Sequence, residues 1–245
     1  MVTFEDRIES SEFVKTLLKR TIKIYSDHLG LYTTPETRPS VPFEEYGANS
    51  SEKKLKIIFR RYQIVSDHFK KIELCKKLIS SETALDYCIE NNITEIEYYQ
   101  YHYETFVTTT ISLLDLLAGL GNEVYNLGLK KTKCNPTNFN KFSKSKSRKS
   151  ALILKSFEKY LSQLKKERNI IIHSGGYESE KIESINSKII NNELIQMDSI
   201  LLDWFSQQKK EKIELLADSI DTAINKYSEF VLCFFESMNE ELKKI

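Results

Sequence analysis

The residue types best suited to chemistry lie in one short stretch, residues 168–173, which read R-N-I-I-I-H and are followed directly by Ser-Gly-Gly. The stretch places a permanent cation (Arg168), an amide (Asn169) and a titratable imidazole (His173) close together in the sequence. An imidazole has an unperturbed pKa of about 6.5, so it can take or give a proton near neutral pH. We therefore take these three residues as the candidate catalytic residues.

The helix expected to carry this stretch has an apolar stripe that leads to the arginine. Apolar residues recur at the spacing of three and four that defines one face of a helix: Leu154, Phe157, Leu161 and Leu164. The same spacing leads next to Arg168, which is predicted to lie where a core side chain belongs. A guanidinium cannot lose its charge, so this position requires water or an anion, either a carboxylate or a phosphate.

Similar spacing extends along most of the chain and predicts an all-α fold. The 245 residues include only seven glycines and four prolines, and 40% of them are hydrophobic, which is enough for a sizeable core. We expect an antiparallel helical bundle with an N-terminal helical extension. Gly119 and Gly121 interrupt the longest predicted helix and suggest a close helix approach or a bend. The predicted helices are Glu5–His28, Leu55–Ile79, Glu82–Glu90, Thr94–Gly128 and Glu211–Leu242. The less periodic stretch Tyr177–Gln207 is expected to hold a short helix near Leu201–Phe205, and K-I-I-N-N-E-L-I within it is equally compatible with a small hairpin.

Three of the four prolines fall in the segment Leu31–Ser50, which interrupts the helical pattern. One division of the chain gives an N-terminal helix and linker over residues 1–50 and a bundle over residues 51–245. The alternative is a single domain over residues 1–245.

Composition excludes several classes of protein and site. Basic residues number 36 and acidic residues 35, so the chain as a whole is not a polycation and nucleic-acid contacts must come from local clusters. No signal peptide and no apolar run of about 18 residues is visible, so we expect a soluble cytoplasmic protein without membrane contact. Four scattered cysteines without a C-x-x-C pair indicate reduced thiols, and we expect neither a metal nor a cofactor.

The join of R-N-x-x-x-H to a helix end and a Gly-Gly pair, in an all-helical chain, resembles the R-x(4–6)-H motif of the HEPN superfamily (higher eukaryotes and prokaryotes nucleotide-binding). Many of its members are metal-independent endoribonucleases. Asn169 fills the polar position that often follows the family's arginine, and His173 matches the family's histidine. The upstream stretch Y-H-Y-E-T-F-V-T-T-T-I-S-L-L-D-L-L also resembles the helix that precedes the motif. The resemblance covers about residues 95–245.

The resemblance implies RNA as the substrate, a homodimer, and attack of a ribose 2′-hydroxyl on the adjacent phosphodiester. On a helix, Asn169 and His173 share a face, whereas Arg168 and His173 diverge by about 140°. One copy cannot easily direct both at one phosphate, so two motifs meeting across a two-fold axis would form the site. Family members often act as toxins or phage-defence effectors, which makes an antitoxin protein a further expected partner.

Two alternatives stay open from the sequence. One is a catalytically inactive HEPN-like module that binds RNA, a nucleotide or a protein. In the other, Arg168 pairs with an acid such as Glu167 or Asp115, and His173 caps the helix end. The variant motif R-x(4)-H-x-Y, which occurs in members paired with nucleotidyltransferase antitoxins, is absent because Gly175 stands at the tyrosine position.

A second cluster, which we call the basic segment, spans residues 130–149 and is expected to be a loop. It contains eight lysines and arginines, no acid, and two phenylalanines, Phe139 and Phe142. Basic residues can neutralise phosphates and aromatic rings can stack on bases, although a solvated connection has the same composition. The candidate RNA-binding residues are Lys141, Lys144, Lys146, Arg148 and Lys149.

Overall fold

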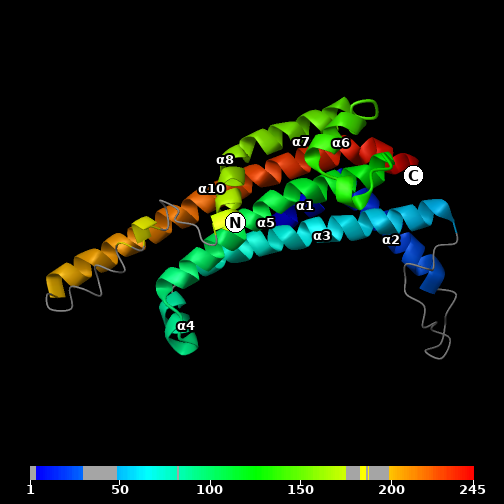
Figure 1. Cartoon of the computed structure of the whole chain (residues 1–245). Helices are drawn as coiled ribbons and strands as arrows, with labels where there is room; N and C mark the ends of the chain where they lie inside the picture. Colours follow the sequence, from blue (N-terminus) through cyan, green and yellow to red (C-terminus); the bar gives the residue numbers. More distant parts are fainter. Residues whose placement is uncertain (1–3, 30–48, 82, 175–182, 186, 188–198) are drawn as a thin grey trace. The chain divides into compact units, whose positions relative to one another are not determined.

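The computed structural model describes residues 4–29, 49–81, 83–174, 183–185, 187 and 199–245. Within these ranges the chain forms helices and no strand, which confirms the prediction of an all-α helical fold (Figure 1). No helix in the described ranges is both long and apolar enough to cross a membrane. Much of the stretch 177–207, including the expected hairpin at 188–195, lies outside the described residues, whereas the short helix expected near residues 201–205 falls within the helix Ser199–Lys244.

Ten elements follow one another in the described residues, and three of them are long. The long helices are α3 (Ser50–Ile79), α5 (Glu95–Tyr125) and α10 (Ser199–Lys244). Each lies where the apolar spacing predicted a helix. The shorter elements are α1 (Phe4–Glu9), α2 (Glu12–Leu29), α4 (Ala84–Asn91), the 3-10 turn η3 (Lys131–Lys133), α6 (Pro136–Ser143), α7 (Arg148–Tyr160) and α8 (Ser162–Ser174).

The chain divides into two compact units, each assembled from separate segments. Unit 1 comprises Met1–Asp67, Leu113–Lys159 and Tyr227–Ile245, and unit 2 comprises His68–Ser112 and Tyr160–Lys226. The long helices α3, α5 and α10 contribute residues to both units. A domain boundary near residue 50 stays a prediction.

The core of unit 1 contains the apolar faces of α2, α3 and α10. Phe13 and Leu17 of α2 and Ile58 and Val65 of α3 are fully buried. Phe235 of α10 lies against the ring of Phe13, with 5.1 Å between ring centroids. Burying each such side chain stabilises the fold by about 1.5–3 kcal/mol, so these apolar faces hold the three helices of this unit together.

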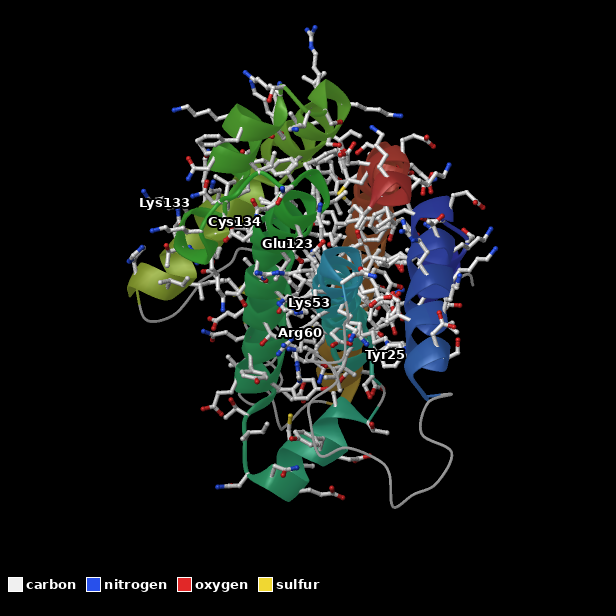
Figure 2. All side chains as sticks on the ribbon, turned by 90° about the vertical axis from the view of Figure 1, so that its right-hand side faces the viewer. Tyr25, Lys53, Arg60, Glu123, Lys133 and Cys134 are labelled. Carbon is white, nitrogen blue, oxygen red and sulfur yellow. The ribbon has the colours of Figure 1, made fainter. Side chains whose placement is uncertain are left out.

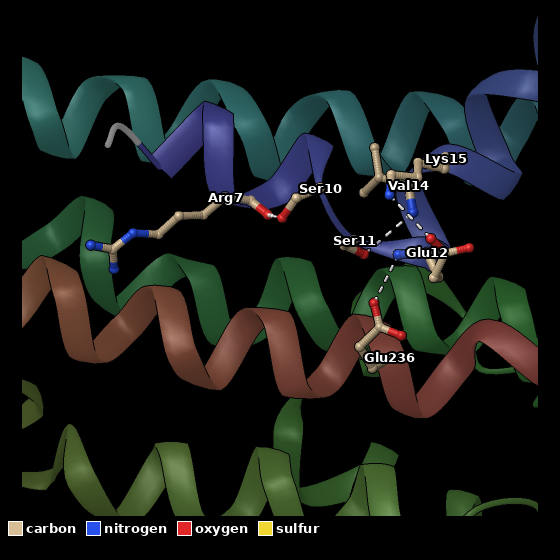
Figure 3. Close-up of polar contacts among 7 residues, drawn as sticks. All are labelled: Arg7, Ser10, Ser11, Glu12, Val14, Lys15 and Glu236. Atoms are coloured by element: carbon tan, nitrogen blue, oxygen red, sulfur yellow. Dashed lines mark hydrogen bonds and ion pairs between the residues drawn. The ribbon is translucent and has the colours of Figure 1, made fainter. Parts of the chain in front are cut away.

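The N-terminal segment forms two helices, and the prediction of one helix over Glu5–His28 is wrong at residues 10 and 11. The Ser10 hydroxyl donates to the Arg7 carbonyl (2.6 Å), and the Ser11 hydroxyl accepts from the Val14 amide (3.4 Å). The free amide of Glu12 donates to the Glu236 carboxylate of α10 at 3.0 Å (Figure 3). Serine hydroxyls compete with the helix backbone for hydrogen bonds, so this pair ends one helix and starts the next.

The basic segment is also more ordered than predicted. Instead of a loop, it contains η3, α6 and the start of α7. The side chain of Asn135 caps α6 by accepting from the Asn138 amide at 2.9 Å, and Pro136 occupies the first turn, where no amide is needed. The Asn-Pro pair therefore starts a helix where composition alone suggested a connection.

The two glycines of α5 have different surroundings, and one of them confirms the predicted close approach. A Cβ placed on Gly121 would lie 2.5 Å from the Phe139 ring of α6 and 3.1 Å from the Phe234 ring of α10. Phe139 is fully buried there. A Cβ on Gly119 would meet only the Arg61 guanidinium, at an ordinary 3.7 Å. The absent side chain at Gly121 is thus what lets α6 pack against α5.

Unit 2 includes the C-terminal part of α3, α4, the N-terminal part of α5, α8 and the larger, N-terminal part of α10. The hydroxyl of Tyr98 donates to the Leu78 carbonyl at 2.9 Å. Lys209 of α10 forms an ion pair with Glu95 at 3.0 Å. These contacts hold the start of α5 to α10 and to the end of α3.

Candidate functional site

The motif R-N-I-I-I-H occupies the last turns of α8, but its helix is not continuous with the one before it. α7 ends at Tyr160 and α8 begins at Ser162, with Leu161 between them in a turn. The amide of Lys165 donates to the Leu161 carbonyl at 2.9 Å, which starts the new helix. The predicted stripe is therefore divided between two helices.

Burial along this stripe falls sharply after the turn. Phe157 and Leu161 are each 1% exposed, whereas Arg168 and Ile171 are only half-buried. The prediction that Arg168 lies on a buried seam is wrong for the single chain. Once the helix restarts at Ser162, the face that carries Arg168 is only partly covered.

The polar residues of the motif are accessible. Asn169 and His173 are exposed, and the Arg168 guanidinium donates a long hydrogen bond of 3.5 Å to the Asn169 side-chain oxygen. In the part of the chain that the structure describes, His173 makes no hydrogen bond or ion pair with either of them. The single chain thus joins Arg168 to Asn169 but not to His173, which agrees with the 140° divergence of Arg168 and His173.

The apolar residues of the motif are exposed as well. Ile170 is 46% exposed and Ile172 is 49% exposed. Single exposed apolar side chains are common on protein surfaces, but these two lie next to the polar residues of the motif in the sequence. The end of α8 therefore exposes both apolar and polar side chains.

One hydrogen bond fixes α8 to α5 within unit 2. The hydroxyl of Tyr103, a residue only 1% exposed, donates to the Glu167 carboxylate at 2.8 Å. Glu167 immediately precedes Arg168 and was a predicted partner for it. Among the described residues Arg168 forms no ion pair with Glu167, whose carboxylate binds the tyrosine.

Tyr103 is a positioning residue that sequence reasoning missed. The hydrogen bond joins residues 64 positions apart, and nothing in the local pattern couples them. The sequence offered one signal for this contact: Tyr103 lies on an aromatic-rich helix, and the hydroxyl of a buried tyrosine usually forms a hydrogen bond.

The candidate RNA-binding residues belong to unit 1, whereas α8 belongs to unit 2. All five, Lys141, Lys144, Lys146, Arg148 and Lys149, are exposed. Phe142 is 48% exposed, with the Lys141 ammonium 5.8 Å from its ring centroid. The expected stacking role of Phe139 is wrong, because that ring is fully buried between α5 and α10.

A family model described as HEPN_Cthe2314-like HEPN matches residues 56–243 of the chain. The matched range contains all of α8 and the basic segment, and it excludes α1, α2 and the first residues of α3. No curated protein and no solved structure matches the chain.

Proposed function

This chain belongs to the HEPN_Cthe2314-like HEPN family, and on that premise we propose that it is a metal-independent endoribonuclease. Its site would combine Arg168, Asn169 and His173 from two copies of the chain. The observation that carries the proposal is the motif itself, placed on the last turns of α8 with its amide and imidazole exposed and its guanidinium half-exposed. HEPN domains often dimerise and bind RNA, and many are ribonucleases.

One exposed isoleucine supports a contact between two copies. Ile172 lies between Arg168 and His173 around the helix, so a two-fold pairing through this face would bury its apolar side chain. The same pairing would bring the arginine of one copy near the histidine of the other. A phosphate could then meet both groups, which a single motif does not offer.

The chemistry follows from the three side chains. His173 takes the proton from a ribose 2′-hydroxyl, and the resulting oxygen attacks the adjacent phosphorus. The bond from phosphorus to the 5′-oxygen breaks, and the imidazolium of the second copy protonates that oxygen. Arg168 stabilises the charge on the non-bridging oxygens, and Asn169 orients the imidazole or the phosphate. The products are a 2′,3′-cyclic phosphate and a 5′-hydroxyl.

The basic segment would supply RNA affinity outside the site. Its exposed cations can neutralise phosphates, and Phe142 offers a ring on which a base can stack. An RNA-cleaving protein of this kind suits a growth-arresting toxin or a phage-defence effector in the cytoplasm. A toxin would require an antitoxin protein as its partner.

A cleavage assay on labelled single-stranded RNA tests the proposal. His173→Ala and Arg168→Ala should each lower the rate by about 10²–10⁴, because each removes proton transfer or charge stabilisation. Lys166→Ala is the matched control, since it removes an exposed cation from the same helix. Cleavage should persist in EDTA, and DNA should resist because it lacks the 2′-hydroxyl.

The outcomes separate the proposal from its alternatives. Equal cleavage by wild type and both motif variants would indicate a contaminating nuclease. RNA binding without cleavage by any protein would favour the inactive module. A monomer by light scattering at micromolar concentration would contradict the composite site, and a requirement for added metal would contradict the mechanism.

A further inference from the structure

Unit 1 contains a pocket of about 930 Å³ whose walls are strongly basic. We call it the basic pocket. It is lined by residues of α2, α3 and η3, among them five cations and a tyrosine: Lys53, Lys56, Arg60, Arg61, Lys131 and Tyr25. Figure 2 shows Lys53 and Arg60 on α3, between the helix that carries Tyr25 and the segment that contains Lys133 and Cys134.

The cations gather because of their spacing on α3. Lys53, Lys56 and Arg60 follow one another at three and four residues, which places them on one helix face. Apolar residues at Ile57 and Ile64 share that face. The sequence therefore contained a signal for this site, in a helix whose opposite face supplies the core.

Lys56 is unusual for a lysine because only 6% of it is exposed. Burial lowers its pKa, while the charge of Glu52 raises it and the charge of Lys53 lowers it. An anion in the basic pocket would favour the charged form of Lys56 in the same way as Glu52 does.

Acidic residues lie near the basic pocket but not in its described lining. Burial raises the pKa of the Cys134 thiol; the charge of Arg61, a pocket residue, lowers it, and the charges of Glu123 and Asp115 raise it. Neither acid lines the pocket, and the lining residues that the structure describes include none. The described part of the lining therefore carries positively charged side chains and no carboxylate.

We propose that the basic pocket binds a nucleoside polyphosphate. Five cations around one pocket match several phosphate charges held close together on one small molecule, whereas an RNA strand presents a single charge per nucleotide. The half-buried rings of Tyr25 and Phe59 and the adjacent isoleucines supply apolar surface for a base. The volume lies within the usual range of small-molecule sites.

This site does not depend on the proposed nuclease activity. The basic pocket belongs to unit 1 and α8 to unit 2. Tyr25 and Lys53 also precede residue 56, where the match to the family model begins. Ligand binding at the basic pocket can therefore be tested independently of RNA cleavage by the motif residues.

Titration calorimetry on the full chain at about 0.15 M salt tests the proposal. The ligands are ATP, GTP, adenosine, inorganic triphosphate and a single-stranded RNA oligonucleotide. A double variant, Lys53→Ala with Arg60→Ala, removes two exposed pocket cations. The control, Lys71→Ala with Lys77→Ala, removes two exposed cations from the same helix outside the pocket. Melting curves without ligand show whether each variant folds.

We expect a nucleoside triphosphate to bind the wild type and the control, and to bind the pocket variant at least about tenfold more weakly. Adenosine should not bind, since it lacks the charges, and inorganic triphosphate should bind more weakly than the nucleotide. Binding of triphosphate and nucleotides with equal affinity would reduce the pocket to a general anion site and overturn the proposal. RNA binding that depends on Lys53 and Arg60, without nucleotide binding, would overturn it in favour of an RNA path.

Discussion

The two glycines of α5 allow one substitution to be compared in two environments. Alanine at either position gains about 1 kcal/mol in helix propensity over glycine. At Gly119 the new Cβ meets only the Arg61 guanidinium, at 3.7 Å, which is ordinary van der Waals contact. We therefore expect Gly119→Ala to stabilise the protein by up to about 1 kcal/mol.

At Gly121 the same methyl group has no room. It would lie 2.5 Å and 2.8 Å from two atoms of the Phe139 ring and 3.1 Å from Phe234. Both rings are buried, at 0% and 1% exposure, so neither can swing into solvent. Overpacking typically costs about 1–3 kcal/mol, and contacts this short favour the upper end. After the propensity gain, Gly121→Ala should destabilise the protein by about 2 kcal/mol.

Thermal melting and urea unfolding of the full-length variants measure this difference. A gap of about 3 kcal/mol between the two variants corresponds to about 6–12 °C in Tm. Adding Phe139→Leu to Gly121→Ala should recover part of the loss, because the clash involves that ring. Equal stability of the two alanine variants would refute the packing of α6 against α5 through Gly121.

Three further predictions concern unit 2 and the basic segment. Tyr103→Phe should lower the Tm by about 2–4 °C and slow RNA cleavage, because it removes the hydrogen bond that holds α8; Tyr101→Phe, at an exposed ring, should change neither. Burial lowers the pKa of His102, so its contribution to stability is present above the unfolded pKa of about 6.5 and is lost as the pH falls towards its folded pKa. The Tm of His102→Phe should therefore fall less than that of wild type between pH 7 and pH 5, and parallel curves would contradict this. Alanine at four basic-segment positions should weaken RNA binding and flatten its dependence on salt, whereas an unchanged salt slope would indicate a solvated surface. The four positions are Lys141, Lys144, Lys146 and Arg148.

The sequence by itself determined the long helices and the motif, because both are local properties. Apolar residues spaced for one helix face, such as Ile58, Val65 and Phe69 in α3, must bury that face, and the structure buries all three completely. The order R-N-I-I-I-H was readable without any fold and pointed to the family that the chain belongs to. The ends of some helices were less predictable, because a cap such as Asn135 consists of only one or two residues and leaves little pattern in the sequence.

The tertiary structure decided everything that joins distant parts of the chain. At the break between α1 and α2, the Glu236 carboxylate accepts a hydrogen bond from the Glu12 amide, 224 residues away in the sequence. Tyr103 donates a hydrogen bond to Glu167, 64 residues away. From the sequence, Phe139 was expected to be an exposed ring in a basic loop, but it is buried because Gly121 has no side chain in its place. A side-chain period shows which residues share a face, but only packing determines what covers that face. For that reason the partial exposure of Arg168, and the pocket that the cations of α3 form with Tyr25 and Lys131, were visible only in three dimensions.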